Sequence, residues 1–312
     1  MFPLILAITL YAAFSPVQPA LPVGGLPGDG YRSFLPLAAT AAEPAVDSAA
    51  PVKDDPLRIG LELESESAVV LDWSTGKALY AKAADMPRPV ASVTKLLTAL
   101  VVLDAGVPLD DTVEIASSDA RPGGIPYVVP GERIRVVDLL HSSLIASANG
   151  ATVALSRSVG LTPEGFADRM NSLAREIGLR SASFVEPTGL DPDNVASARD
   201  VALLVRHALQ NDLVAEIVLK RDYEFQAETG LHHRIGSTDS LLSGHISEPP
   251  FGFLGGKTGF LQEAGYCFGA AAHDGDGNRI IAVALGAPSK RARFDEVSAL
   301  MYWTFDAYTW PK

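Results

Sequence analysis

A serine and a lysine stand three residues apart at the start of a long apolar segment. Ser92 and Lys95 lie in ASVTKLLTALVVLDAG, residues 91–106, whose hydrophobic spacing predicts a helix. Residues three apart share one face of a helix, so the hydroxyl and the amine come within hydrogen-bonding reach. Because this helix is apolar on nearly every side, we expect Lys95 to be buried, and burial favours the neutral amine. The pair has the chemistry of a serine nucleophile activated by a lysine base.

A structural interpretation of the same pair is also available. Ser92 would then cap the helix, and Lys95 would extend its ammonium group to solvent. The chain contains a second Ser-x-x-Lys, from Ser74 to Lys77, in a segment that reads as a hairpin turn. Spacing alone therefore does not separate a catalytic pair from a structural one.

Two further motifs provide the context for this pair. SAN, residues 147–149, lies between two helical segments, and KTG, residues 257–259, opens an expected strand. A fixed cation beside a hydroxyl is suited to binding a carboxylate. Taken singly, Ser147 would be a helix cap and Lys257 a charge that protects an edge strand. The order of all three motifs along the chain argues against coincidence.

Composition and charge exclude several classes of function. The 312 residues include 25 basic and 37 acidic side chains, a formal net charge of -12, which disfavours nucleic acid and anionic membrane surfaces as partners. The six histidines form no His-Glu-x-x-His motif, and His232 and His233 would face opposite sides of a strand. Cys267 lies in an apolar run and is expected in the core. We expect neither a metal nor an organic cofactor.

The first residues of the chain indicate export. MFPLILAITLYAAF has the length of a signal-peptide apolar region, so residues 1–42 are expected to be an export signal or an N-terminal anchor. Cleavage after the first twenty residues, cleavage near Ala41 and an uncleaved anchor stay open. Residues 43–58, rich in Ala, Pro and Asp, are expected to be a flexible linker to a catalytic domain at 59–312. The expected location is extracytoplasmic, in the periplasm or cell envelope.

Apolar periodicity predicts strands at both ends of this domain and helices between them. In order, the expected elements are a hairpin at 67–84, helices at 91–106, 135–147, 149–160, 162–179 and 197–211, strands at 221–226, 255–262, 265–272 and 279–287, and a helix at 290–309. Thr162 and Ser197 are the expected helix caps. The economical fold is α+β, with one antiparallel sheet formed by both chain ends, flanking helices and an inserted helical lobe. A cleft between sheet and lobe follows.

The three motifs, in this order, resemble those of the penicillin-interacting serine enzymes. The likeness is strongest to the low-molecular-mass D-alanyl-D-alanine carboxypeptidases and endopeptidases that trim peptidoglycan. It covers roughly residues 60–310 and includes FVEPTGLDPDNVASARDVALL and GGKTGFLQEAGYCF. The VEPTGL and KTGF forms look more like the endopeptidase branch. The resemblance implies the fold shared by DD-peptidases and β-lactamases.

The same resemblance assigns the catalytic roles. It implies that Ser92 is the acylated nucleophile, that Lys95 is its general base, and that Ser147 relays a proton toward the leaving amine. The backbone N–H groups of Ser92 and Phe260 would form the oxyanion hole.

Substrate-binding roles follow from the resemblance as well. Asn149 would orient the catalytic lysine and bind the substrate backbone, and Lys257 and Thr258 would bind the terminal carboxylate. Gly259 would let the strand backbone approach the substrate. Glu186 in the VEPTGL segment suggests a deacylating base of the class A β-lactamase kind, but this segment occurs in the family without that role, and its spacing to Asn194 does not fit the β-lactamase pattern. We interpret Glu186 as structural.

The leading expectation for function is a penicillin-sensitive serine D-alanyl-D-alanine carboxypeptidase acting on peptidoglycan stem peptides. An endopeptidase that cleaves cross-links between stem peptides uses the same residues. A non-hydrolytic penicillin sensor and a β-lactamase share the motifs and stay open as alternatives. β-Lactams are expected to acylate the serine. Because the chain stops soon after the final core helix, no C-terminal membrane anchor is expected.

Overall fold

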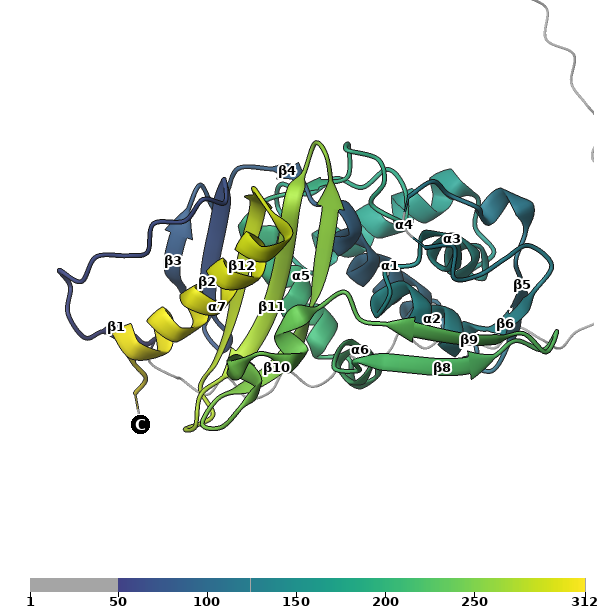
Figure 1. The fold of residues 1–312 in the computed structure, drawn as a ribbon. Helices are drawn as coiled ribbons and strands as arrows, with labels where there is room; N and C mark the ends of the chain where they lie inside the picture. The colour runs from purple at the N-terminus through teal and green to yellow at the C-terminus, as the bar shows by residue number, and fades with distance from the viewer. Residues whose placement is uncertain (1–49, 124, 312) are drawn as a thin grey trace, which may run out of the picture. The chain divides into compact units, whose positions relative to one another are not determined.

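A five-stranded antiparallel sheet organises the fold in a computed structural model that describes residues 50–123 and 125–311. Its order is β10-β11-β12-β2-β3, so strands from the two ends of the chain are neighbours (Figure 1). The strands are β2 (Ser67–Asp72), β3 (Ala78–Lys82), β10 (Gly252–Leu261), β11 (Gly265–His273) and β12 (Arg279–Ala287). β12 pairs with β2 so that Val283 lies opposite Val69. The expected α+β class, with a sheet from both chain ends, is confirmed.

Helices cover both faces of this sheet. α7 (Lys290–Ala307) packs on one face and α5 (Ala198–Leu209) on the other (Figure 1). Because successive strand residues point to opposite faces, β2 divides its apolar side chains between two cores. Val69 and Leu71 join the core shared with α5 and the helical lobe, while Ala68 and Val70 join the core under α7. A strand buried on both faces reads as an unbroken apolar run, as β2 does.

The helical lobe is inserted between β3 and β10. It contains α1 (Thr94–Asp104), α2 (Val136–Leu144), α3 (Asn149–Arg157) and α4 (Pro163–Glu176), and α6 (Asp212–Val218) follows α5. The hydroxyl of Thr162 accepts the Gly165 N–H at 3.1 Å, and Ser197 accepts the Asp200 N–H at 3.1 Å. Both predicted helix caps are therefore confirmed. Short strand pairs join the lobe: β4 (Arg88–Pro89) with β7 (Val195–Ala196), and β5 (Thr112–Glu114) with β6 (Arg133–Arg135).

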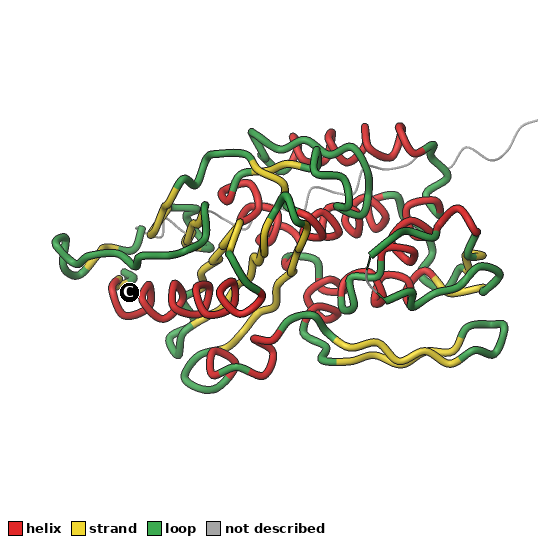
Figure 2. The backbone as a smooth tube through the Cα atoms, turned by 45° about the horizontal axis from the view of Figure 1, so that its top comes forward, coloured by secondary structure: helices red, strands yellow, loops and turns green. Residues whose placement is uncertain are grey.

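Two features differ from the sequence expectations. The expected strand at 221–226 is β8 (Asp222–Gln226), and it pairs with β9 (His232–Gly236). The expected order of elements did not include β9, although His232 and His233 were expected to face opposite sides of a strand. Figure 2 shows this two-stranded ribbon alongside the helical lobe. In the expected linker, β1 (Val52–Lys53) pairs with β13 (Tyr308–Thr309), and this pairing ends the last helix at Ala307. Those linker residues are ordered because the far end of the chain supplies their hydrogen-bond partners.

The remaining N-terminal expectations fall outside the described residues. The export signal or anchor at 1–42 and the linker up to residue 49 lie in that part of the chain. Residues 50–58 belong to the same compact unit as the sheet and the lobe. No helix in the described ranges combines the length and the hydrophobicity that a membrane crossing requires.

Candidate active site

Ser92 lies in a single 3-10 turn, Ala91–Val93, that leads directly into α1. Its hydroxyl caps neither the turn nor the helix, and it accepts a hydrogen bond from Lys95 Nζ at 2.7 Å. The Lys95 side chain is completely buried. The predicted juxtaposition of hydroxyl and amine on one helix face is therefore confirmed, and the interpretation of Ser92 as a cap and Lys95 as a solvent-exposed lysine is wrong.

Three oxygen atoms surround the Lys95 amine. Besides Ser92 Oγ, they are Asn149 Oδ1 at 2.9 Å and the carbonyl of Thr188 at 2.6 Å. Burial lowers the pKa of Lys95 to about 7, and the negative charge of Glu186 opposes this shift. An amine with this pKa is neutral in about half of the molecules at neutral pH, and only the neutral form accepts a proton. Lys95 is thus positioned and tuned to deprotonate Ser92.

Two glycines approach the backbone of the Ser92 turn closely. Ala91 has φ 49°, a left-handed conformation that non-glycine residues adopt rarely. A Cβ on Gly189 would lie 2.0 Å from the carbonyl oxygen of Ala91, and a Cβ on Gly259 would lie 2.7 Å from that of Val90. The Gly259 position would also lie 3.2 Å from the Ser92 nitrogen. The absence of two side chains therefore lets a loop and β10 enclose the turn.

Glu186 organises the loop that carries Thr188. Its carboxylate accepts the backbone N–H groups of Thr188 and Leu190 at 2.7 and 2.9 Å, and the side-chain amide of Asn194 at 2.9 Å. Neither carboxylate oxygen is hydrogen-bonded to Lys95. Glu186 thus positions the loop so that the Thr188 carbonyl accepts a hydrogen bond from the Lys95 amine. Its direct effect on Lys95 is electrostatic. The contacts agree with the structural interpretation of this glutamate.

Ser147 and Lys257 form the second half of the site. Ser147 has φ 58° in the short link between α2 and α3, and its hydroxyl accepts from Lys257 Nζ at 2.9 Å. Lys257 also donates to the carbonyl of Thr258 at 3.0 Å and exposes 1% of its surface. Burial, followed by the charges of Lys95 and Arg293, lowers its pKa well below the ordinary value. The charged form of this amine is therefore disfavoured in the free site, and an anion that binds beside it would stabilise that form.

Strand β10 places the remaining motif residues at the edge of the sheet. The Thr258 hydroxyl lies 2.6 Å from that of Thr238, and Arg293 from α7 donates to the carbonyl of Gly259 at 2.9 Å. Phe260 is half exposed, and its ring packs against Tyr266 with centroids 4.3 Å apart. The following residues of the three motifs are thus gathered in one region: Ser92, Lys95, Ser147, Asn149, Lys257, Thr258 and Gly259.

Sequence reasoning missed several members of this region. Arg293 lies on the terminal helix, and Thr238 precedes Thr258 by twenty residues, so neither belongs to a motif. Thr188 contributes a backbone carbonyl, which any residue type has. Only the VEPTGL likeness pointed to its segment. These groups reach the site through packing between distant elements.

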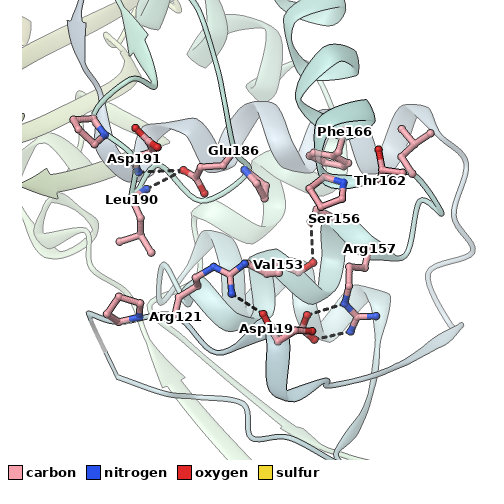
Figure 3. A pocket seen from close by; sticks show the side chains of 16 residues that line it. Asp119, Arg121, Val153, Ser156, Arg157, Thr162, Phe166, Glu186, Leu190 and Asp191 are labelled. Atoms are coloured by element: carbon pink, nitrogen blue, oxygen red, sulfur yellow. Dashed lines mark hydrogen bonds and ion pairs between the residues drawn. The ribbon is translucent and has the colours of Figure 1, made fainter.

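A pocket of about 630 Å³ lies in the helical lobe, and none of the residues of the SVTK, SAN and KTG motifs lines it (Figure 3). Figure 3 shows Leu190 and Asp191 on one side and Phe166 with Arg157 on the other. The Arg157 guanidinium pairs with buried Asp119 at 2.5 Å. The pocket is lined by Ser118, Asp119, Arg121, Pro122, Val153, Ser156, Arg157, Leu161, Thr162, Pro163, Phe166, Glu186, Pro187, Leu190, Asp191 and Pro192. Glu186 belongs both to this lining and to the loop that fixes Lys95.

The histidines and the cysteine have structural surroundings. His232 and His233 face opposite sides of β9, and buried His233 contacts Glu132 at 2.7 Å. Burial raises the pKa of Cys267 to about 11, so its thiol is protonated at neutral pH. The prediction that Cys267 is a core residue is confirmed. Over the described ranges, no three His, Cys, Asp or Glu side chains are grouped as a metal site requires.

Comparison with known proteins places this geometry in a family. The family model Peptidase_S11, D-alanyl-D-alanine carboxypeptidase, matches residues 51–289. The chain belongs to this family. The expected family and fold are therefore confirmed.

Named relatives include both carboxypeptidases and endopeptidases. D-alanyl-D-alanine carboxypeptidase DacF of Bacillus subtilis is 31% identical over 251 residues, covering 78% of this chain and 63% of DacF. A D-alanyl-D-alanine endopeptidase of Pseudomonas aeruginosa is 34% identical over 226 residues, covering 70% of this chain and 71% of that protein. The chain thus spans less than two thirds of DacF.

Solved structures of related chains share the fold. The crystal structure of the Streptomyces K15 DD-transpeptidase superposes with a TM-score of 0.73 at 27% sequence identity. The match covers 80% of this chain and 100% of the transpeptidase. The likeness therefore extends over the sheet and the helical lobe together.

Proposed function

We propose that this protein is a serine D-alanyl-D-alanine carboxypeptidase that acts on peptidoglycan stem peptides. One observation carries the proposal: the fully buried Lys95 amine lies 2.7 Å from Ser92 Oγ. Burial lowers the pKa of Lys95 to about 7. Membership of the Peptidase_S11 family supports this chemistry over that of an unrelated serine hydrolase. We also infer an extracytoplasmic location, because peptidoglycan lies outside the cytoplasm.

Acylation begins with attack of Ser92 Oγ on the carbonyl carbon of the penultimate D-alanine. Neutral Lys95 takes the hydroxyl proton as the new C–O bond forms. The carbonyl oxygen becomes an oxyanion, and the backbone N–H groups of Ser92 and Phe260 are the proposed donors to it. The place of Gly259 against the Ser92 nitrogen supports this pair of donors.

Collapse of the tetrahedral intermediate breaks the C–N bond to the terminal D-alanine. Its amine receives the proton from Lys95 by way of the Ser147 hydroxyl, leaving an ester on Ser92. Water then attacks the ester, Lys95 accepts a proton from it, and that proton returns to Ser92 Oγ as the acid product leaves. Each proton taken by the lysine is thus given back within one cycle.

Substrate recognition is assigned to the second half of the site. Lys257 and Thr258 bind the terminal carboxylate, and Asn149 holds Lys95 while its amide offers a hydrogen bond to the substrate backbone. The carboxylate would stabilise the charged form of Lys257, whose buried amine lies on the edge strand β10. Penicillins carry a carboxylate at a comparable distance from a reactive carbonyl, so we expect them to acylate the same serine.

Intact-mass spectrometry after incubation with benzylpenicillin tests the nucleophile. The native protein should gain the mass of one penicillin, while the Ser92→Ala variant should gain none. Equal labelling of both proteins would exclude Ser92. Labelling of the native protein without turnover of any peptide would instead favour a penicillin sensor, and rapid multiple-turnover hydrolysis of a cephalosporin would favour a β-lactamase.

Endopeptidase activity on peptidoglycan cross-links is the second candidate. It is favoured by the likeness to the Pseudomonas aeruginosa protein, which is named an endopeptidase. A monomeric pentapeptide and a cross-linked muropeptide dimer separate the two activities when the products are analysed by chromatography. Release of D-alanine from the pentapeptide supports the carboxypeptidase, and cleavage of the dimer alone supports the endopeptidase.

A further inference from the structure

A buried carboxylate belongs to the residue that follows Thr238, which contacts the KTG strand. Asp239 follows Thr238, whose hydroxyl is 2.6 Å from that of Thr258, and it exposes 9% of its surface. Its Oδ1 accepts the backbone N–H of Leu241 at 2.8 Å. Its Oδ2 is buried and finds no hydrogen-bond partner within the described residues. One oxygen of the carboxylate thus has a structural role, while the other is desolvated without compensation.

Two buried cations act on this carboxylate. Lys257 and Arg293 both interact with Asp239 by charge, yet in the described chain neither lies within 4.0 Å of its oxygens as an ion pair. The Nε of Arg293 is also buried without a partner. The free site therefore gathers two basic side chains and one carboxylate, and the buried Arg293 Nε is left as a donor for a second carboxylate.

We propose that Asp239 is a specificity-determining residue that balances the charges of Lys257 and Arg293 in the free site and becomes protonated when a ligand carboxylate binds. This inference rests on the proposed role of Lys257 and Thr258 in carboxylate recognition. Two carboxylates that share the same cations repel each other, and the less well hydrogen-bonded one protonates more readily. The proton comes from solvent and is bound at the free Oδ2.

The electrostatics of the free site support this assignment. Burial raises the pKa of Asp239 to about 7, while the Leu241 N–H and then the charges of Arg293 and Lys257 oppose the shift. A ligand carboxylate takes up part of that positive charge and adds a negative one, so it raises the pKa of Asp239 further. Above the pKa of the free site, binding then requires uptake of a proton. Affinity for carboxylate ligands should fall about tenfold for each pH unit in that range.

Other titratable groups surround the two cations and must be separated from Asp239. Lys95 on α1 faces Lys257 and itself titrates near pH 7, and Tyr266 and Cys267 on β11 face Arg293. Lys95 controls acylation of Ser92 by every ligand, whether or not the ligand carries a carboxylate. A comparison of two ligands that differ only in the carboxylate therefore cancels the titration of Lys95. The pKa of Lys257 is lowered as well, and Lys257 is retained in Asp239→Asn, so a pH dependence that persists in this variant belongs to Lys257 and not to Asp239.

The experiment compares the acylation of Ser92 by benzylpenicillin and by its methyl ester, as second-order rate constants from pH 6 to pH 8. The ratio of acid to ester measures carboxylate recognition alone. In the native protein this ratio should fall about tenfold from pH 6 to pH 8 as Asp239 ionises. In Asp239→Asn it should change less than about twofold and exceed the native ratio at pH 8. Asp276→Asn, at an exposed turn, is the control and should follow the native protein.

Each other outcome has a defined meaning. A ratio near one at every pH would reject the proposed carboxylate site, whereas a ratio above one with the same pH dependence in both proteins would reject only the role of Asp239. A lower ratio for Asp239→Asn at pH 8 would also overturn the inference, because Asp239 would then serve to keep Lys257 charged. The asparagine keeps an Oδ1 acceptor for Leu241, so the local turn is preserved.

A second measurement does not depend on the folding of that variant. Ser92→Ala protein should bind an acylated D-alanyl-D-alanine peptide with uptake of close to one proton at pH 8, seen by calorimetry in buffers of different protonation enthalpy. The same titration with the peptide amide should take up none. Binding of the acid without proton uptake would overturn the inference, even if the asparagine variant does not fold.

Discussion

The pH dependence of acylation tests the tuning of Lys95 most directly. An ordinary lysine with a pKa near 10.4 is neutral in about 0.04% of molecules at pH 7. Since burial lowers the pKa of Lys95 to about 7, the neutral form rises to about half, a gain of roughly three orders of magnitude in active base. Between pH 6 and pH 8 the neutral fraction increases from about 9% to about 91%. We therefore expect the acylation rate to rise about tenfold over this interval.

The assay is stopped-flow or quenched labelling of Ser92 with the methyl ester of a penicillin, because the ester removes any contribution from carboxylate binding. The rate constant should follow a single ionisation with a midpoint near pH 7. Lys95→Ala should lose about 10²–10⁴-fold in rate and show no such midpoint. A native profile that stays flat to pH 8, or that bends only near pH 10, would refute the idea that burial tunes this amine.

The stability of the protein should depend on the same group. The folded-state pKa of Lys95 is depressed, so the unfolded chain binds more protons between pH 7 and the ordinary lysine pKa. The contribution of Lys95 therefore makes the free energy of unfolding increase with pH across that interval. The loss of stability that comes from burying Lys95 is fully present below its folded-state pKa. It decreases as the pH rises from that value toward the ordinary lysine pKa.

Three further predictions follow from the packing around the site. Gly189→Ala should lower the free energy of unfolding by about 3 kcal/mol or more in thermal melts, because its Cβ would meet the Ala91 carbonyl oxygen at 2.0 Å. Gly160 has a similar φ with open space around it, so Gly160→Ala should lower the free energy of unfolding by only about 1–2 kcal/mol. Equal losses in the two variants would contradict the steric argument. Thr258→Val should reduce kcat/KM for a D-alanyl-D-alanine peptide about tenfold, since it leaves the Thr238 hydroxyl unpaired, and unchanged steady-state kinetics would count against that bond. Cys267 should resist iodoacetamide in the folded protein at pH 8 and react after denaturation, as read by mass spectrometry, whereas rapid modification of the native thiol would show that it is not buried.

Much of the fold was predictable because its signals are local. The caps Thr162 and Ser197 act within one helical turn, and the turn between β2 and β3 contains Gly76 with φ 70°. The strand β9 was missing from the expected order of elements because its five residues, HHRIG, include two histidines and an arginine. It forms a strand because β8 supplies backbone partners from Asp222 to Gln226. Polar ribbons of this kind depend on pairing more than on intrinsic preference.

The structural roles of β1 and Asp239 depend on partners that lie far away in the chain. The Ala- and Pro-rich composition around β1 favours an unpaired chain, yet Val52 and Lys53 bind the last residues of the protein. In the same way, Asp239 looks like an ordinary turn residue in the sequence. Its desolvation and its nearness to Lys257 and Arg293 arise only when α7 and β10 pack around it.

The order of residues along the chain specifies which groups are available for chemistry and how far apart the nearest of them lie. Ser92 and Lys95 face each other because three residues make nearly one helical turn, and this holds wherever the helix lies. Tertiary structure alone decided the ionisation of Lys95, the contact of Ser147 with Lys257, and the position of the Thr188 carbonyl. These properties depend on the removal of water and on contacts between residues far apart in the chain, for which local sequence carries no pattern.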